Sequence, residues 1–257
     1  MAGHSKWANI RHKKGAKDKA RAAALGKAST AIIAASKACN GDMSNLRLQS
    51  AIAHAKSVQL PKDRIEDAVA KGTSKGSGEA DLLNLRYDAM LSLSGSKVAC
   101  IVTALTDNRN RTASSVRHLI TKEGAGELMP TGSLSHVFQH VGQILVEDIR
   151  DEDALLESAM EAGALNMEAQ DGNADENDES STGRQYLVTT EDTDLFQVVE
   201  SLREAGYIVS QFEHCYALQD PEHGGVELSS DGEEALIQFL DKMDENEDVT
   251  NVFHNAI

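Results

Sequence analysis

The spacing of hydrophobic residues changes at a glycine-rich segment, Gly72–Gly78, and this change divides the chain into two kinds of structure. Before the segment, apolar residues recur every three to four positions, which is typical of amphipathic helices. After it, short apolar runs with β-branched residues alternate with helical patterns. The segment has the composition of a flexible linker. We therefore expect an α+β protein, with an N-terminal three-helix domain followed by two α/β domains.

The N-terminal region is predicted to contain three helices, over residues 17–39, 44–59 and 61–72. The first ends at Asn40-Gly41, a good C-terminal cap pair. The third begins at Pro61, whose missing N–H is not needed in the first helical turn. Together they predict a small helical bundle.

Beyond the linker, the first predicted elements are a buried strand over residues 97–105 and a helix over residues 112–122. A βαββαβ pattern follows, which indicates a ferredoxin-like domain. Its elements cover residues 143–148, 153–162, 165–170, 185–189, 194–205 and 208–218. A helix over 233–243 and a strand over 250–254 come last, and this strand could return to pair with the 97–105 strand. The predicted domains are 1–78, a discontinuous 79–140 with 226–257, and an inserted 141–225, in which the acidic loop 171–183 connects two strands.

Charge is distributed unevenly along the chain, whose formal net charge is −16. Residues 1–75 carry 15 Lys and Arg against five Asp and Glu, whereas residues 76–257 carry 10 against 36. A strongly acidic protein repels polyanions at long range, so an end that stays basic indicates a local anion-binding surface. Nucleic acid is the polyanion that this pattern favours.

The first 27 residues hold eight Lys and Arg side chains against a single acid, Asp18. Lys and Arg contact phosphates, and the indole of the chain's only Trp can stack on a base. The alternative is a solvated basic tail with Trp7 packed on the bundle; we favour nucleic-acid contact, because clustered basic arms are its electrostatic footprint. The predicted contact residues are Lys6, Trp7, Arg11, His12, Lys13, Lys14, Lys17, Lys19 and Arg21.

A second polar segment, Asp107–Thr112, lies where the 97–105 strand gives way to a helix. Free N–H groups at a helix N-terminus, with Arg109 and Arg111 beside them, could bind phosphate. Equally, Asp107 or Asn110 could cap the helix while the arginines pair with acids of the chain. The later segment 129–133 is interpreted as an ordinary turn before a strand over 134–138.

Signals for a metal site, a cofactor site or catalysis are weak, so we predict no metal, no cofactor and no enzymatic activity. His136 and His140 are spaced i, i+4 but lack the glutamate of a zincin, and no phosphate-binding loop or nucleophile elbow is present. Three scattered Cys favour a reducing compartment. Without an apolar run of about 20 residues or a secretory signal, we expect a cytoplasmic protein, or an organellar matrix protein supplied without its transit peptide.

Several separate motifs, in order along the whole chain, resemble those of the YebC family. They are Ala2–Lys13, Pro61–Asp63, Thr106–Thr112, Val116–His118, Thr131–Ser133 and Asn251–Asn255. The family includes the mitochondrial translational activator of cytochrome oxidase subunit one. The resemblance implies three domains and a non-enzymatic, nucleic-acid-binding role, as DNA-binding transcriptional regulators or as ribosome-associated factors. This chain departs from the family pattern at Tyr87–Ser96, which replaces a glycine-rich turn, and at Phe138–Gly142, which lacks the usual cations.

Three functions remain in competition at this point. The first is a translation factor that docks its basic helical domain on ribosomal RNA, with no membrane partner. The second is a transcriptional regulator that contacts DNA through the same arm, although no helix-turn-helix spacing supports direct base reading. The third is a small-molecule enzyme that uses the loop around Arg109 and Arg111 as an anion pocket.

Overall fold

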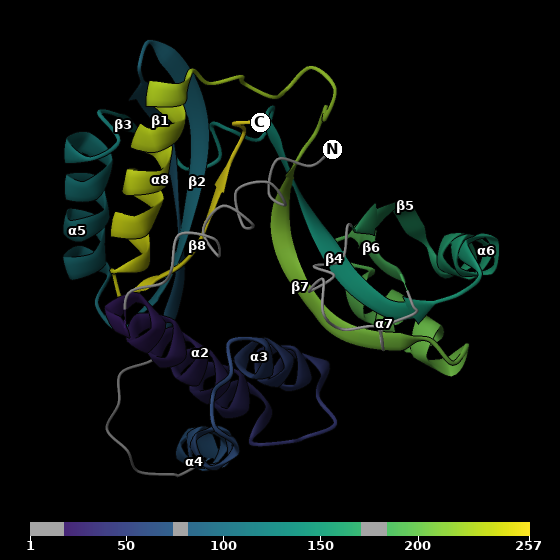
Figure 1. Cartoon of the computed structure of the whole chain (residues 1–257). Helices are drawn as coiled ribbons and strands as arrows, with labels where there is room; N and C mark the ends of the chain where they lie inside the picture. Colours follow the sequence, from purple (N-terminus) through teal and green to yellow (C-terminus); the bar gives the residue numbers. More distant parts are fainter. Residues whose placement is uncertain (1–17, 74–81, 171–183) are drawn as a thin grey trace. The chain divides into compact units, whose positions relative to one another are not determined.

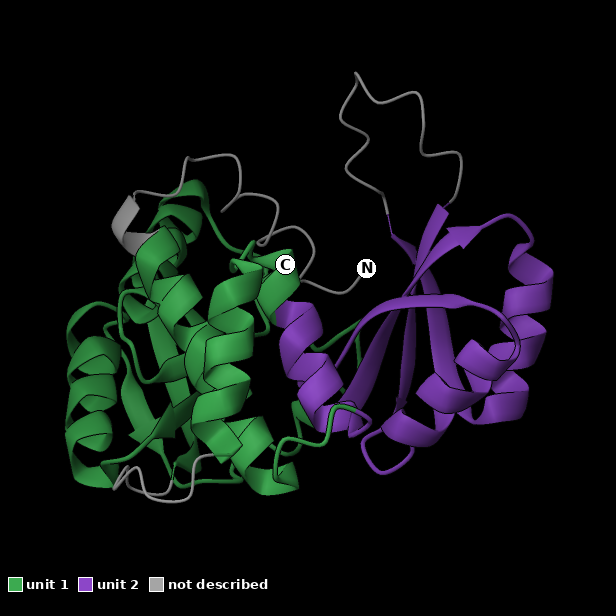
Figure 2. Cartoon of the chain, turned by 90° about the horizontal axis from the view of Figure 1, so that it is seen from below, with its two compact units in different colours: residues 1–43, 55–139, 217–257 green, residues 44–54, 140–216 purple. Residues whose placement is uncertain are grey.

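The computed structural model describes residues 18–73, 82–170 and 184–257 (Figure 1), with side chains described from residue 21 onward. The chain forms two compact units (Figure 2). Unit 1 holds residues 1–43, 55–139 and 217–257, and unit 2 holds residues 44–54 and 140–216. The division into three domains stays a prediction.

The three predicted N-terminal helices are present as α2 (Asp18–Cys39), α3 (Leu46–Ser57) and α4 (Lys62–Thr73). Helix α2 ends as predicted, because Asn40 and Gly41 adopt positive φ angles of 52° and 75° and the Gly41 N–H donates to a carbonyl in the last turn. Within the described ranges, no helix has both the length and the apolar character that crossing a membrane would need.

Helices α2 and α4 approach each other closely through small residues. The Ser36 hydroxyl donates to the carbonyl of Val69 at 2.8 Å, and a Cβ on Gly72 would lie 2.6 Å from the Ser36 Cβ. Gly72, predicted as the end of the helix, is therefore needed for packing as well.

The sheet of unit 1 contains β1 (Leu83–Leu93), β2 (Ser96–Thr106), β3 (Glu127–Met129) and β8 (Val249–His254), in the order β3-β1-β2-β8. All three pairings are antiparallel. Helices α5 (Arg109–Lys122) and α8 (Ser230–Asp244) cover one face of it (Figure 1). Val116, Phe239 and Val102 belong to the buried core between these layers. The predicted return of the terminal strand to β2 is confirmed.

Strands β1 and β3 were absent from the sequence prediction. Strand β1 carries Arg86 and Asp88 among its apolar residues, which hides its periodicity. A usable signal was present nevertheless. Ser94 and Gly95, both at positive φ, form the two-residue loop between β1 and β2, and such loops are the shortest hairpin connections.

Unit 2 has the ferredoxin-like order predicted from the sequence. Along the chain its elements are β4 (Phe138–Ile149), α6 (Glu152–Ala162), β5 (Ala164–Gln170), β6 (Arg184–Glu191), α7 (Leu195–Glu204) and β7 (Ile208–Leu218). The sheet order is β5-β6-β4-β7, and α6 and α7 pack on one face around Ile144, Tyr186 and Leu202. Residues 44–54 join this unit, where the Ser50 hydroxyl donates to the carbonyl of Phe212 on the edge strand β7 at 2.5 Å.

The carboxylate of Asp88, on β1, is fully buried and fixes the turn before β4. It accepts hydrogen bonds from the Gly132 N–H at 2.9 Å and the Leu134 N–H at 3.1 Å. The Arg86 guanidinium adds a bidentate contact at 2.6 and 3.0 Å. Because these bonds hold residues 131–137 as consecutive turns, the predicted strand over 134–138 was wrong, and β4 begins only at Phe138.

We predict that Asp88→Ala destabilises the protein by about 3–5 kcal/mol, because it leaves a guanidinium and two backbone N–H groups without their anion. Glu227→Ala, at an exposed acid of the same unit, is the control and should stay within about 0.5 kcal/mol of the parent. Urea unfolding of the full chain measures both. Equal unfolding midpoints for the two variants would contradict the role given to Asp88.

Candidate nucleic-acid interface

Most of the predicted basic arm lies outside the described residues. This holds for Lys6, Trp7, Arg11, His12, Lys13, Lys14 and Lys17. Lys19 belongs to α2, with its side chain outside the description. Arg21 is exposed on α2, and its Nη2 donates to Oε1 of Gln59 at 3.1 Å. Because Gln59 is neutral, this hydrogen bond does not compensate the positive charge of Arg21.

The helices beyond the arm carry further exposed cations that the sequence argument did not select. In unit 1 these are Lys37, Lys56, Lys62, Arg64 and Lys71, and Arg47 is exposed in unit 2. From residue 21 onward, where side chains are described, the acids of the same helices and loops are Asp42, Asp63, Glu66 and Asp67, all exposed. Lys62 pairs with Glu66 at 3.7 Å, a contact of little energetic weight at this exposure. The signal that could have found these cations is their place on the polar faces of the predicted helices.

The second candidate segment forms the N-terminus of α5. Asn108 is the N-cap residue, and its side-chain oxygen accepts from the Arg111 N–H at 3.1 Å. The alternative that Asp107 or Asn110 caps this helix was wrong. Asn108 fits the cap because its backbone is still extended while its carbonyl already accepts from Thr112.

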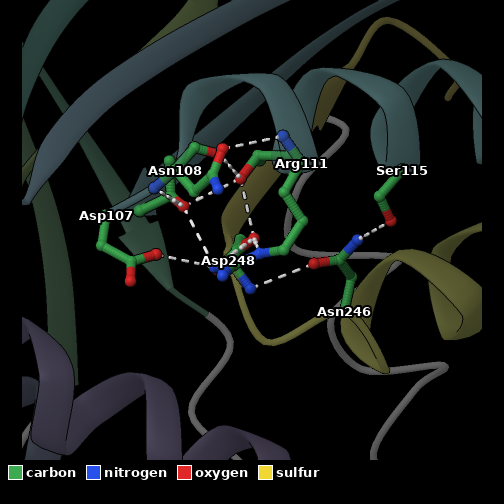
Figure 3. A network of polar contacts seen from close by, with 8 residues as sticks. Asp107, Asn108, Arg111, Ser115, Asn246 and Asp248 are labelled. Atoms are coloured by element: carbon green, nitrogen blue, oxygen red, sulfur yellow. Dashed lines mark hydrogen bonds and ion pairs between the residues drawn. The ribbon is translucent and has the colours of Figure 1, made fainter.

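The side chain of Arg111 is held by two carboxylates of the chain (Figure 3). Its Nη2 lies 2.8 Å from an oxygen of Asp107 and 3.0 Å from Oδ1 of Asp248. The hydroxyl of Thr112 donates to Asp248 Oδ2 at 2.7 Å. The hydrogen bond with Asp248 is the main cause that raises the pKa of Arg111. The anion bound at the start of α5 is therefore the chain's own carboxylate.

Arg109 differs from Arg111, although only one residue separates them in the sequence. It is exposed, and its side chain forms no hydrogen bond or ion pair with the described part of the chain. Burial raises the pKa of the Tyr87 hydroxyl, and the positive charge of Arg109 offsets part of that rise. Of the two arginines predicted for this loop, Arg109 is the one with donors available for an external phosphate.

Unit 2 brings together two histidines that the sequence did not pair. His140, on β4, lies 3.0 Å from a carboxylate oxygen of Asp192, and its ring stacks on that of His214, on β7, at 5.6 Å. His136 belongs instead to the turn before β4, where its Nδ1 contacts the Ser133 carbonyl. Throughout the described ranges, no three His, Cys, Asp or Glu side chains are arranged to hold a metal ion.

Together these observations describe a two-unit α+β protein whose candidate site is a set of exposed cations. The chain belongs to the TACO1/YebC family. Residues 5–75 match the model of the TACO1/YebC protein N-terminal domain, and residues 84–256 match that of the TACO1/YebC second and third domain.

Similar proteins cover the full length of the chain. A probable transcriptional regulatory protein of Thermoanaerobacter pseudethanolicus is 37% identical over 100% of this chain and 97% of its own length. One from Petrotoga mobilis is 38% identical over 99% and 94%. The crystal structure of a conserved hypothetical protein from Aquifex aeolicus superposes with a TM-score of 0.70 at 30% identity, covering 92% of this chain and 90% of that one.

We predict that Arg111→Ala lowers the melting temperature, whereas Arg109→Ala leaves it unchanged. Arg111 neutralises two carboxylates that would otherwise repel each other, and Arg109 has no such partner in the described residues. Differential scanning calorimetry of both variants tests this difference. Arg111→Lys should recover only part of the loss, because lysine cannot reproduce the bidentate geometry. An unchanged melting temperature in Arg111→Ala would contradict the network.

A second prediction concerns Asp192, whose pKa is lowered in the folded protein chiefly by the hydrogen bond with His140. A carboxyl whose pKa is lowered by folding stabilises the protein above its unfolded pKa of about 4. This stabilisation is lost as the pH falls through the pKa of Asp192 in the folded protein. The stability difference between the parent and His140→Ala should therefore shrink below about pH 4. Carbon-detected NMR titration should show the Asp192 pKa rising in His140→Ala; an unchanged pKa would refute the pairing.

Proposed function

We propose that the protein is a non-enzymatic, nucleic-acid-binding regulator of gene expression that associates with the ribosome and contacts ribosomal RNA through its basic N-terminal region. The observation that carries this proposal is the charge distribution. Fifteen cations against five acids lie in residues 1–75, while the rest of the chain is strongly acidic. One basic region can enter a phosphate-lined site, whereas a long duplex lying across the acidic remainder would be repelled.

The sheet of unit 2 supports this placement by offering no alternative platform for bases. Ferredoxin-like domains that bind RNA through the sheet stack bases on aromatic side chains of the central strands. Here the face opposite the helices carries Gln143 and Leu145 on β4, and Leu187 and Thr189 on β6. Gln143 lies opposite Thr189 and Leu145 opposite Leu187, so these positions provide neither a ring nor a cation.

Direct DNA binding in transcription is the second candidate. The names of the similar bacterial proteins, probable transcriptional regulatory proteins, favour it. The same basic region would make the contact, so the two candidates differ in target and not in surface. Ribosome association would place the protein in the cytoplasm, or in an organellar matrix.

The enzyme alternative depended on an anion pocket around Arg109 and Arg111. Asp248 already occupies the guanidinium of Arg111, so a substrate anion would have to displace a carboxylate that also bonds Thr112. This geometry favours a supporting role for Arg111 over substrate binding, and it leaves Arg109 as an auxiliary phosphate contact within the proposal.

The two candidates are separated by measuring both targets at the same ionic strength. Co-sedimentation with purified ribosomes and an electrophoretic shift with duplex DNA should be compared at about 0.15 M salt, where non-specific DNA binding is already weak. Ribosome pelleting without a DNA shift supports the proposal. A DNA shift without ribosome association would replace it with the transcriptional role.

We predict that the basic arm sets the salt dependence of binding. If all eight cations of residues 1–27 neutralised duplex phosphates, the log–log slope would be about −7, and it would be shallower for single-stranded RNA. Replacing Lys6, Arg11, Lys13 and Lys14 by Gln in the full chain should reduce the magnitude of the slope by about 3–4 units.

The matched control for this substitution removes acids instead of cations. Glu200→Gln with Glu204→Gln, on exposed positions of α7 in unit 2, should leave the slope unchanged. Arg64→Glu, at an exposed position of α4, tests whether the helices add to the arm and should weaken binding. A slope near zero in the parent would overturn the electrostatic account.

A further inference from the structure

Helix α6 of unit 2 exposes two large apolar side chains on one stripe. Leu156 is 42% exposed and Met160 is 51% exposed, and their i, i+4 spacing places them on the same side of the helix. The buried stripe of the same helix is formed by Leu155, Ala159 and Ala162. Helix α6 therefore has one apolar stripe in the core and a second one facing solvent.

The two exposed side chains form a group, unlike the single apolar residues that are common on protein surfaces. Of the six large hydrophobic side chains that are exposed in the described residues, two, Leu156 and Met160, lie one turn apart on this helix. Single exposed apolar residues need no explanation, but a group of them rimmed by polar residues marks an interaction site. Methionine adds an adaptable contact, since its unbranched side chain repacks against different partners.

Carboxylates surround this stripe. From its N-cap to its last turn, the helix carries five acids and no cation: Asp151, Glu152, Asp153, Glu157 and Glu161, all exposed. The nearest cation in sequence, Arg150, precedes the N-cap and lies 4.0 Å from Asp148. A partner that covers the apolar stripe must therefore also meet a dense negative charge.

This chemistry selects the occupant. Nucleic acid is disfavoured because its phosphates would face the five carboxylates. A second copy using the same face is disfavoured as well, because a two-fold contact would place Glu157 and Glu161 against their own counterparts. An amphipathic protein helix with leucine-like residues at i, i+4 and flanking Lys or Arg satisfies both the stripe and its rim.

We propose that the outer face of α6 is a docking surface for a basic amphipathic helix of a partner protein. Leu156 and Met160 supply the apolar contact, and Glu157 and Glu161 fix the orientation of the partner's cations. This surface consists of other residues than those assigned to the nucleic-acid contact, so either proposal can fail without the other.

The probe is a synthetic 14-residue helical peptide with leucines at i, i+4 and lysines beside them, labelled for fluorescence anisotropy. A scrambled peptide of the same composition controls for charge alone. With the full-length protein, Leu156→Ser combined with Met160→Ser should weaken binding of the patterned peptide by about tenfold. Leu83→Ser, at an exposed apolar residue of unit 1, should leave it unchanged.

A charge test uses a spacing-matched pair. Glu157→Gln with Glu161→Gln should weaken binding and flatten its salt dependence, whereas Glu200→Gln with Glu204→Gln, also i, i+4 on an exposed helix face, should do neither. All these positions are exposed, so thermal melting should match the parent in every variant. Equal binding of the scrambled peptide, parent-like binding by the α6 variants, or self-association abolished by the Leu156/Met160 substitutions would each overturn the proposal.

Discussion

The architecture of unit 1 depends on the contacts that Asp248 makes. Its side chain is bound by Arg111 and Thr112 at the start of α5, and its backbone carbonyl accepts from the Leu105 N–H at the end of β2 at 2.8 Å. Asn246, two residues earlier, donates to Ser115 of α5 at 2.7 Å (Figure 3). A residue near the end of the chain thereby joins a strand and a helix formed more than a hundred positions before it. The C-terminal strand can pair with β2 because this connection fixes where it begins.

The same contacts explain why a loop with the composition of a phosphate-binding site instead connects the start of α5 to the segment before β8. A helix N-terminus favours a nearby anion, and the chain supplies that anion itself. The donors can be recognised in the sequence but their acceptor cannot, since Asp248 is one of many acids in an acidic region. Only the fold decides which carboxylate reaches the arginine. Arg109, two positions earlier, forms no hydrogen bond or ion pair with the described residues and so keeps its donors.

Much of the fold was predictable because periodicity records which face of an element is buried. The three N-terminal helices, the βαββαβ order and the return of the terminal strand all followed from local patterns. Strand β1 did not, because Arg86 and Asp88 interrupt its apolar residues. Only the structure shows that these two residues form an ion pair and that Asp88 holds the turn at Gly132. The pairing of His140 with Asp192 was equally hidden, since contacts between distant positions leave no trace in spacing. For the candidate site, the basic region is evident from the sequence. The exposed cations of α4 can be selected only after the polar face of that helix has been assigned.

The proposed function depends on charge separation, because a basic region would approach a polyanion that the acidic remainder would repel. The most direct test places photo-cross-linking residues at position 13, at Arg64 and at Glu200 of the full chain, and irradiates the protein with ribosomes. The account predicts cross-links to ribosomal RNA from position 13 and from Arg64, and none from Glu200. RNA cross-links from Glu200, with none from the two basic positions, would contradict it.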